Sequence, residues 1–251
     1  MVRVTIEYGL LLNRPPNKHS ELDMGRNNRK TPDSWSHKAR EAGYAARSVY
    51  KLEEIERRFQ VLRKTRRVLD LGCAPGSWSQ FVRKFRPNVK LVGIDIQEVE
   101  RYQGTFLHQS ILDTTPEEFL LEMGGAADLV LSDMAPNTSG DRFTDHLRQV
   151  ELAQMALQTA LGVLRQNGVF VAKVFDGEDA HPFVLSLSQH FTKVRRVKPA
   201  AVRNESVEFF VVCTGKKRAV HWSPPPPEPV VEPVVAEVTA NEEEDSSSSE
   251  E

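Results

Sequence analysis

The chain has 251 residues, 39% of them hydrophobic, which suits one folded domain with tails. No apolar run approaches the roughly 20 residues that a membrane helix needs. The first residues also lack a secretory signal pattern, so we expect a soluble, cytoplasmic protein with no membrane partner. Two cysteines, Cys73 and Cys213, exclude a disulfide scaffold and a cysteine-based zinc site.

The formal net charge of -2 hides a difference between the body and the end of the chain. Residues 219–251 contain nine acidic residues and no Lys or Arg, which leaves 26 acidic against 33 basic residues before them. A basic body of net charge +7 with an acidic tail suggests a polyanionic partner such as nucleic acid, although such charge also serves solubility alone.

Three segments are expected. Residues 1–34 read as a poorly structured extension and residues 35–218 as one domain. Residues 219–251 read as a disordered tail, because they are rich in Pro, Ser and acidic residues and lack apolar periodicity.

Short β-rich runs alternate with helical patterns through the domain. In chain order the sequence predicts helix 36–59, strand 66–71, helix 77–85, strands 90–95 and 104–108, helix 115–123, strand 127–133, helix 146–166, strand 168–175, helix 181–191, and strands 193–198 and 208–215. Asn167-Gly168 is expected to end the longest helix. This alternation predicts an α/β fold, a seven-stranded, mostly parallel doubly wound sheet with helices on both faces, and the short last connection predicts an antiparallel edge.

The segment LDLGCAPGSWSQ, residues 69–80, leads from a strand through a glycine-bearing turn into a helix. Glycines let a ligand approach the backbone, although a plain strand-to-helix turn has the same pattern. Asp95 ends the second strand, where a carboxylate can accept both hydroxyls of a ribose. A nicotinamide cofactor and S-adenosylmethionine both fit, but the spacing of Gly72 and Gly76 is not G-x-G-x-x-G, and DLGCAPG resembles methyltransferase loops.

Lys173 interrupts the apolar run GVFVAKVFDG, and burying an ammonium group costs several kcal/mol unless something compensates. Asp133 ends the neighbouring strand of the predicted sheet, beside the ligand crevice. An aspartate there is also a common turn or helix cap, but the pairing explains both residues. We expect the two side chains to meet over the cofactor.

Four residues then carry a specific resemblance. Lys51 in RSVYKLEEI, Asp133 in SDMAPN, Lys173 in VAKVF and Glu208 in VEFFVV match the Lys-Asp-Lys-Glu tetrad of the RrmJ/FtsJ family of ribose 2′-O-methyltransferases. The likeness covers about residues 35–217 and is greatest to the bacterial members that act on the large ribosomal subunit. It implies the Rossmann-like methyltransferase fold, S-adenosyl-L-methionine as cofactor, a uridine ribose in 23S rRNA of the 50S subunit as substrate, and a monomer.

The resemblance also implies the roles of the tetrad. Burial and a second cation, Lys51, favour the neutral amine that Lys173 needs to act as general base. Asp133 would orient that lysine, and Glu208 would position Lys51 and the ribose. Methyl transfer from a sulfonium needs no metal, so orientation of the reactants should provide much of the acceleration.

For the cofactor, the resemblance implies that Gly76 and Trp78 contact the methionine side and that Asp95 contacts the ribose. It also places Asp133 near the cofactor. Trp78 could equally be a core aromatic. The family has an acidic residue near the adenine where this chain has Ser110 in HQSILD, so we expect Ser110 or its backbone to hold the adenine amine, with nearby Asp113 as the alternative.

Two basic clusters suggest contacts with RNA phosphates. They are Arg26, Arg29, Lys30, Lys38, Arg40 and Arg47, and then Lys193, Arg195, Arg196 and Lys198. Interleaved Trp35, Tyr44 and Tyr50 could stack on an unpaired base or pack in the core. Two other functions stay open: the same chemistry on tRNA or mRNA caps, and a non-catalytic RNA-binding ribosome-assembly factor, against which the intact tetrad argues.

Overall fold

The computed structural model describes residues 34–137, 139–203 and 206–218. The predicted acidic tail lies outside these residues, and so does the predicted N-terminal extension apart from Ser34. Arg26, Arg29 and Lys30 of the first basic cluster are likewise outside them.

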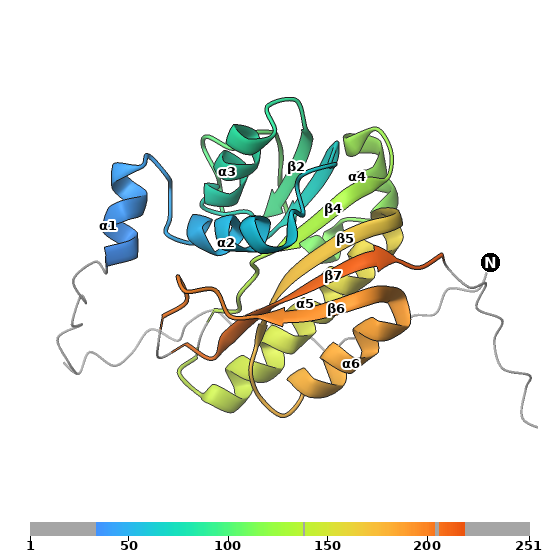
Figure 1. Ribbon diagram of the computed structural model, residues 1–251. Coiled ribbons are helices and arrows are strands. Elements are labelled where there is room, and N and C mark those ends of the chain that lie inside the picture. The colour runs from blue at the N-terminus through green and yellow to red at the C-terminus, as the bar shows by residue number, and fades with distance from the viewer. Residues whose placement is uncertain (1–33, 138, 204–205, 219–251) are drawn as a thin grey trace, which may run out of the picture.

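Seven strands form one sheet in the order β3-β2-β1-β4-β5-β7-β6 (Figure 1). All neighbours pair in parallel except β7, which pairs antiparallel with both β5 and β6 at one side of the sheet. The predicted mostly parallel sheet with an antiparallel edge is therefore confirmed. The strands are β1 Arg67–Leu71, β2 Lys90–Asp95, β3 Thr105–His108, β4 Ala127–Ser132, β5 Leu164–Phe175, β6 Phe191–Val197 and β7 Glu208–Lys216.

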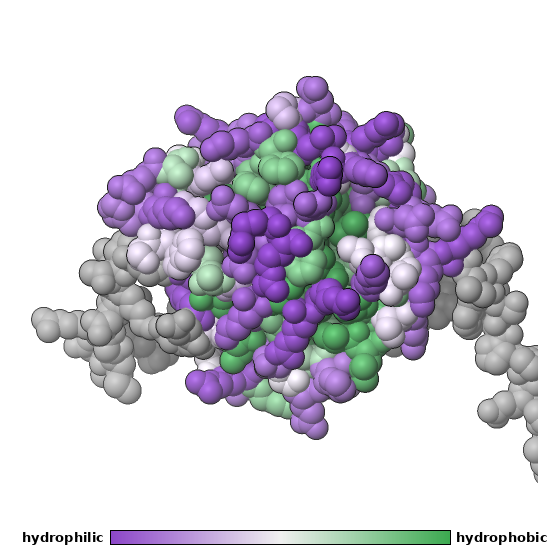
Figure 2. Space-filling view, viewed as in Figure 1, coloured by the Kyte–Doolittle hydropathy of each residue, from purple (hydrophilic) through white to green (hydrophobic). Residues whose placement is uncertain are grey.

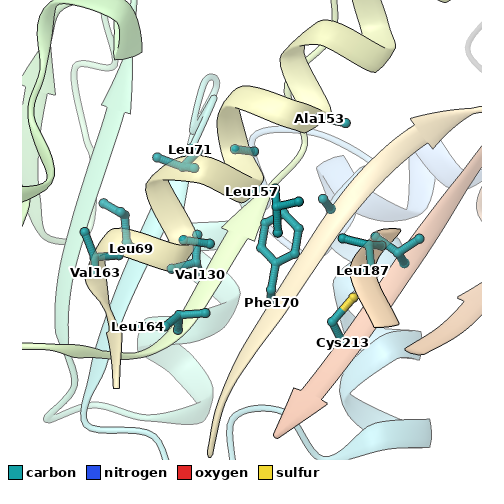
Figure 3. Close-up of a cluster of buried hydrophobic side chains, with 14 of the residues drawn as sticks. Leu69, Leu71, Val130, Ala153, Leu157, Val163, Leu164, Phe170, Leu187 and Cys213 are labelled. Atoms are coloured by element: carbon teal, nitrogen blue, oxygen red, sulfur yellow. The ribbon is translucent and has the colours of Figure 1, made fainter. Parts of the chain in front are cut away.

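Helices cover both faces of the sheet, because β1, β4 and the part of β5 from Gly168 onward are mostly apolar and bury both of their faces. One face packs against α4, α5 and α6, and the other against α1, α2 and α3. Figure 3 shows the first core, with Leu157 of α5 beside Phe170 of β5. The helices are α1 Ser34–Glu41, α2 Val49–Phe59, α3 Ser77–Phe85, α4 Pro116–Met123, α5 Arg142–Val163 and α6 Ala180–His190, with a 3₁₀ turn η1 at Ile111–Asp113.

Two predicted helices differ from the structure. The helix predicted over 36–59 is two helices, α1 and α2, separated by a bend in which Gly43 has a φ of 76°. The longest helix begins earlier, where Asp141 caps it by accepting from the Thr144 N–H, and it ends at Val163. Asn167, with a φ of 62°, and Gly168 do not end that helix: they belong to an irregular start of β5, where its register with β4 shifts.

The surface is predominantly polar, and Figure 2 shows hydrophilic side chains over most of one face with smaller hydrophobic areas between them. Among the described residues, none of the helices has the length and hydropathy required of a membrane span.

Candidate active site

The four tetrad residues meet at the carboxyl end of β5. The Nζ of Lys173 lies 3.1 Å from Oδ1 of Asp133, and the Nζ of Lys51 lies 3.8 Å from that same oxygen. Lys51 also pairs with Oε1 of Glu208 at 2.6 Å. Two cations and two carboxylates thus form one chain, from Lys173 through Asp133 and Lys51 to Glu208.

Sheet topology explains how residues so far apart in sequence come together. Asp133 directly follows β4, whose carboxyl end lies beside that of β5. Because β7 runs antiparallel to β5, its first residue, Glu208, pairs with Phe175 at the same end of the sheet. Lys51 enters from α2 and places its Nζ 5.5 Å from the centre of the Phe210 ring.

The environment of Lys173 shows how a lysine side chain is accommodated inside an apolar strand. Its side chain is only 5% exposed. The Nζ donates a hydrogen bond of 2.7 Å to the main-chain carbonyl of Asp133 and lies against the carboxylate of the same residue. Oδ1 of Asp133 is buried and accepts no hydrogen bond from the described residues, so its contacts with both lysines are purely ionic. A single aspartate therefore meets Lys173 through both its backbone and its side chain.

The turn between β1 and α3 lies beside the tetrad. Gly72 has a φ of 71°, and a Cβ there would lie 2.4 Å from Cγ of Met134, the residue after Asp133. Gly76 begins α3 with a φ of 98°, a conformation that strongly favours glycine. The carboxylate of Asp95 accepts from the main-chain N–H groups of Ala74 and Gln97, both at 2.8 Å. Asp95 therefore shapes the turn, and its oxygens retain lone pairs for a ribose hydroxyl.

Asp70, which sequence reasoning did not single out, is the most perturbed carboxyl group of this region. It is 1% exposed at the end of β1. The pKa of Asp70 is raised to about 7, first by burial and then by the nearby charge of Asp133, while a hydrogen bond from the Tyr102 hydroxyl opposes the shift. Together with Asp133 it lines a small pocket whose other walls are Ser48, Gly72, Cys73, Ala74, Ser77 and Trp78.

Carboxylates that repel one another in a pocket are stabilised when a cation binds between them. S-adenosylmethionine carries two cations, an ammonium and a sulfonium, so the buried Asp70 and the half-buried Asp133 fit this cofactor. Gly72 and Ala74 of the neighbouring turn are half-buried and line the same pocket, so a ligand there lies against their backbone. The residues present therefore suit the cofactor that the sequence implies.

Two predicted cofactor contacts have structural partners of their own. Trp78 is 3% exposed, donates from its indole to the Ser48 carbonyl at 2.8 Å, and packs with its ring centre 5.9 Å from that of Phe210. It is thus a core residue and a pocket wall at once. Ser110 follows β3 and accepts from the Leu112 N–H at the start of η1. Asp113, the alternative for the adenine, is exposed in that same turn.

Side chains from the first turns of α5 form hydrogen bonds to the loops around the site. The sequence pattern did not predict these contacts. The carboxylate of Asp145 accepts from the N–H of Ser139 at 2.7 Å, from its hydroxyl at 2.9 Å and from the N–H of Gly140 at 3.3 Å, and these bonds lower the pKa of Asp145. His146 accepts from the N–H of Asp179 at 3.2 Å, in the connection from β5 to α6. Only the spatial arrangement identifies these contacts, since the partners lie on different elements.

The basic residues predicted to contact RNA are partly engaged within the protein. Lys38 lies over the rings of Trp35 and Tyr50, with its Nζ 5.2 and 4.6 Å from their centres. Arg196 lies over Phe209 and pairs with Asp176, and Lys198 donates to the Ser206 carbonyl.

Trp35, Tyr44 and Tyr50 pack on the core that includes α2 and α3, which agrees with the core interpretation of these aromatics. Within the described part of the chain no cluster of three metal-ligating side chains is present.

Known proteins share this sequence and architecture. The family pattern described as FtsJ-like methyltransferase matches residues 44–216. The chain is 41% identical over 217 residues to ribosomal RNA large subunit methyltransferase E of Caulobacter vibrioides, covering 86% of this chain and 92% of the relative. The proteins of that name from Sphingopyxis alaskensis and Zymomonas mobilis are 42% and 44% identical, over 75% and 73% of this chain and 83% and 84% of theirs.

A crystal structure from Plasmodium falciparum, of a protein described as a ribosomal RNA methyltransferase, superposes with a TM-score of 0.62. It is 26% identical and covers 69% of this chain and 98% of its own. The family match spans the cofactor turn and all four tetrad residues, and the Plasmodium falciparum structure superposes on the described fold. The chain therefore belongs to the FtsJ-like methyltransferase family.

Proposed function

We propose that this protein transfers the methyl group of S-adenosylmethionine to the 2′-hydroxyl of a uridine ribose in 23S rRNA of the large ribosomal subunit, with Lys173 as general base. The observation that carries the chemistry is the continuous chain of Lys173, Asp133, Lys51 and Glu208 beside the cofactor turn. The curated relatives named for the large ribosomal subunit support the substrate.

The cofactor supplies an electrophilic methyl group on its sulfonium when bound. Gly76, Trp78 and Asp133 would hold its methionine side, Asp95 its ribose, and Ser110 its adenine. Asp70, buried beside Asp133, adds a second carboxylate that becomes more favourable as an anion once a cation lies against it.

Lys173 is placed to remove the proton of the ribose hydroxyl. Its Nζ is held by the carbonyl and the carboxylate of Asp133, so the ammonium that forms on taking the proton is stabilised where it stands. Lys51 brings a second positive charge to the same carboxylate, and Glu208 fixes Lys51 at 2.6 Å. The two lysines thus differ in role: Lys173 accepts the proton, and Lys51 is held in place by its own carboxylate.

A pocket of about 320 Å³ adjoins the tetrad and suits the acceptor nucleotide. Its lining residues are Arg47, Lys51, Arg203, Ser206 and Glu208, so it shares two members with the tetrad. Guanidinium groups match phosphate oxygens in charge and geometry, which supports a phosphodiester next to the reacting ribose.

The test measures transfer of labelled methyl to undermethylated large subunits, with small subunits, free 23S rRNA and bulk tRNA in parallel. We expect label on a ribose oxygen of large-subunit rRNA alone, lost on Lys173→Ala and retained on Lys90→Ala, a control at an exposed lysine that begins β2. Full transfer by Lys173→Ala would overturn the base assignment. Label on tRNA would overturn the substrate, and absence of label on every RNA despite cofactor binding would favour a non-catalytic RNA-binding factor.

A further inference from the structure

Gln149 of α5 is a buried polar residue, 1% exposed, whose side chain faces the backbone of the candidate active site. Its amide nitrogen Nε2 donates to two main-chain carbonyls, that of Met134 at 3.0 Å and that of Lys173 at 3.3 Å. The first belongs to the residue after Asp133 and the second to the proposed base itself. One amide group thus joins the two strand ends that carry Asp133 and Lys173.

This connection lies where the sheet no longer provides one. The pairing of β4 with β5 ends at Ser132 and Ala172, so Asp133 and Met134 lie beyond the last pair of the ladder. Lys173 still pairs with Phe210 of β7 on its other side. Among the described residues, strand pairing therefore holds Lys173 on the β7 side only, and on the other side the Gln149 amide joins it to the segment after Asp133.

Met134 is confined from the opposite side as well. Gly72 of the cofactor turn packs so closely that a Cβ on it would lie 3.0 Å from Cα of Met134. The main chain after Asp133 is consequently held between the cofactor turn and Gln149. A loss of the amide would leave this segment held by the turn and by the flexible Lys173 side chain, whose Nζ donates to the Asp133 carbonyl.

The remaining atom of the amide argues against a role in packing. Oε1 of Gln149 is buried and has no hydrogen-bond partner in the described part of the protein. An unpaired buried acceptor is unfavourable, so an apolar side chain of the same length would fill this site better if only volume mattered. Glutamine instead provides the two N–H donors of Nε2, which are both directed to carbonyls at the site.

We propose that Gln149 is a positioning residue that aligns Asp133 with Lys173 by tying their backbones together. The inference rests on the proposed function, in which these two residues move the proton. Displacing a reacting group by about 1 Å can reduce a rate on the order of 100-fold, so two hydrogen bonds at this place have a large effect on turnover. They touch neither the cofactor pocket lining nor the acceptor pocket lining.

The test compares Gln149→Met, which keeps length but has no donors, with Val150→Ala, a buried control on the same helix that makes no contact of this kind. We expect kcat to fall about tenfold or more for Gln149→Met, with the KM for RNA and the Kd for S-adenosylmethionine within about twofold of wild type. Val150→Ala should lower the melting temperature and leave kcat within about twofold. An unchanged kcat for Gln149→Met, or an equal loss in both variants, would overturn the proposal.

Hydrogen exchange provides a readout without substrate. In Gln149→Met, amides of the peptide 133–140 should exchange about fivefold faster or more, and in Val150→Ala they should not. Unchanged exchange in Gln149→Met contradicts the proposal. If that variant does not fold, Gln149→Leu also removes the donors and adds no buried charge. Wild-type protein that labels no RNA would refute the proposed function alone, since exchange still decides the role of Gln149.

Discussion

Asp70 provides a sharp prediction about stability and cofactor binding, because its carboxyl group is buried beside two others. Its pKa is raised from 3.8 to about 7, first by burial and then by the charge of Asp133. The folded protein therefore holds a proton that the unfolded chain releases over this pH range. The free energy of unfolding must therefore fall as the pH rises from about 4 towards 7. At higher pH it stays at this lower value.

The size of this loss follows from the two pKa values. A difference of about three units corresponds to roughly 4 kcal/mol in the free energy of unfolding once the pH exceeds both values. Between about pH 5 and pH 8 the change is about 2.5 kcal/mol, since part of it has already occurred by pH 5. Asp70→Asn removes the titration and keeps the shape.

Urea unfolding of both proteins at the two pH values measures the difference. The cofactor-free wild type should lose about 2.5 kcal/mol more than Asp70→Asn on going from pH 5 to pH 8. Saturating S-adenosylmethionine should reduce this gap, because its cations favour ionised Asp70, and the variant should bind the cofactor more weakly. Equal pH dependence in the two cofactor-free proteins would refute the assignment of this titration to Asp70.

Two further predictions concern the cofactor turn and the adenine contact. Gly72→Ala should destabilise the protein more than Gly43→Ala, and of the two variants only Gly72→Ala should abolish methyl transfer. Both positions have a positive φ, but a Cβ at Gly72 would clash with Met134, whereas a Cβ at Gly43 would enter open space. Similar urea midpoints and similar activities in the two variants would contradict this reasoning. Ser110→Ala should weaken the Kd for S-adenosylmethionine about threefold to tenfold by calorimetry, and Asp113→Asn should not; the reverse order would assign the adenine to Asp113.

Local patterns predicted most of the fold. All seven strands lie within a few residues of their predicted places, because β-rich runs such as those of β1 and β4 are short and mostly apolar. The predicted helix boundaries were wrong where the same residue types occur in more than one kind of local structure. Asn167-Gly168 is a common helix end, but here the pair takes part in a strand irregularity, and the bend at Gly43 was read as a continuing helix.

The site divides in the same way. Lys51, Asp133, Lys173 and Glu208 could be named from short motifs, and the structure brings them together, while their catalytic roles stay predictions. The role of Asp70 could not be predicted from a short motif, since its burial depends on elements distant in sequence. Gln149 could not be found either, because nothing local marks a helix glutamine whose partners are carbonyls 15 and 24 residues away.

The ion pair between Lys51 and Glu208 joins two residues near opposite ends of the described chain. During synthesis the glycine turn and the helix with Lys51 emerge early, whereas Glu208 emerges only after most of the domain has been made. A nascent or truncated chain that ends before β7 can thus contain every predicted cofactor contact and still lack a complete tetrad. The tetrad is therefore complete only once β7 has been made. This order would keep unfinished chains inactive at the ribosome.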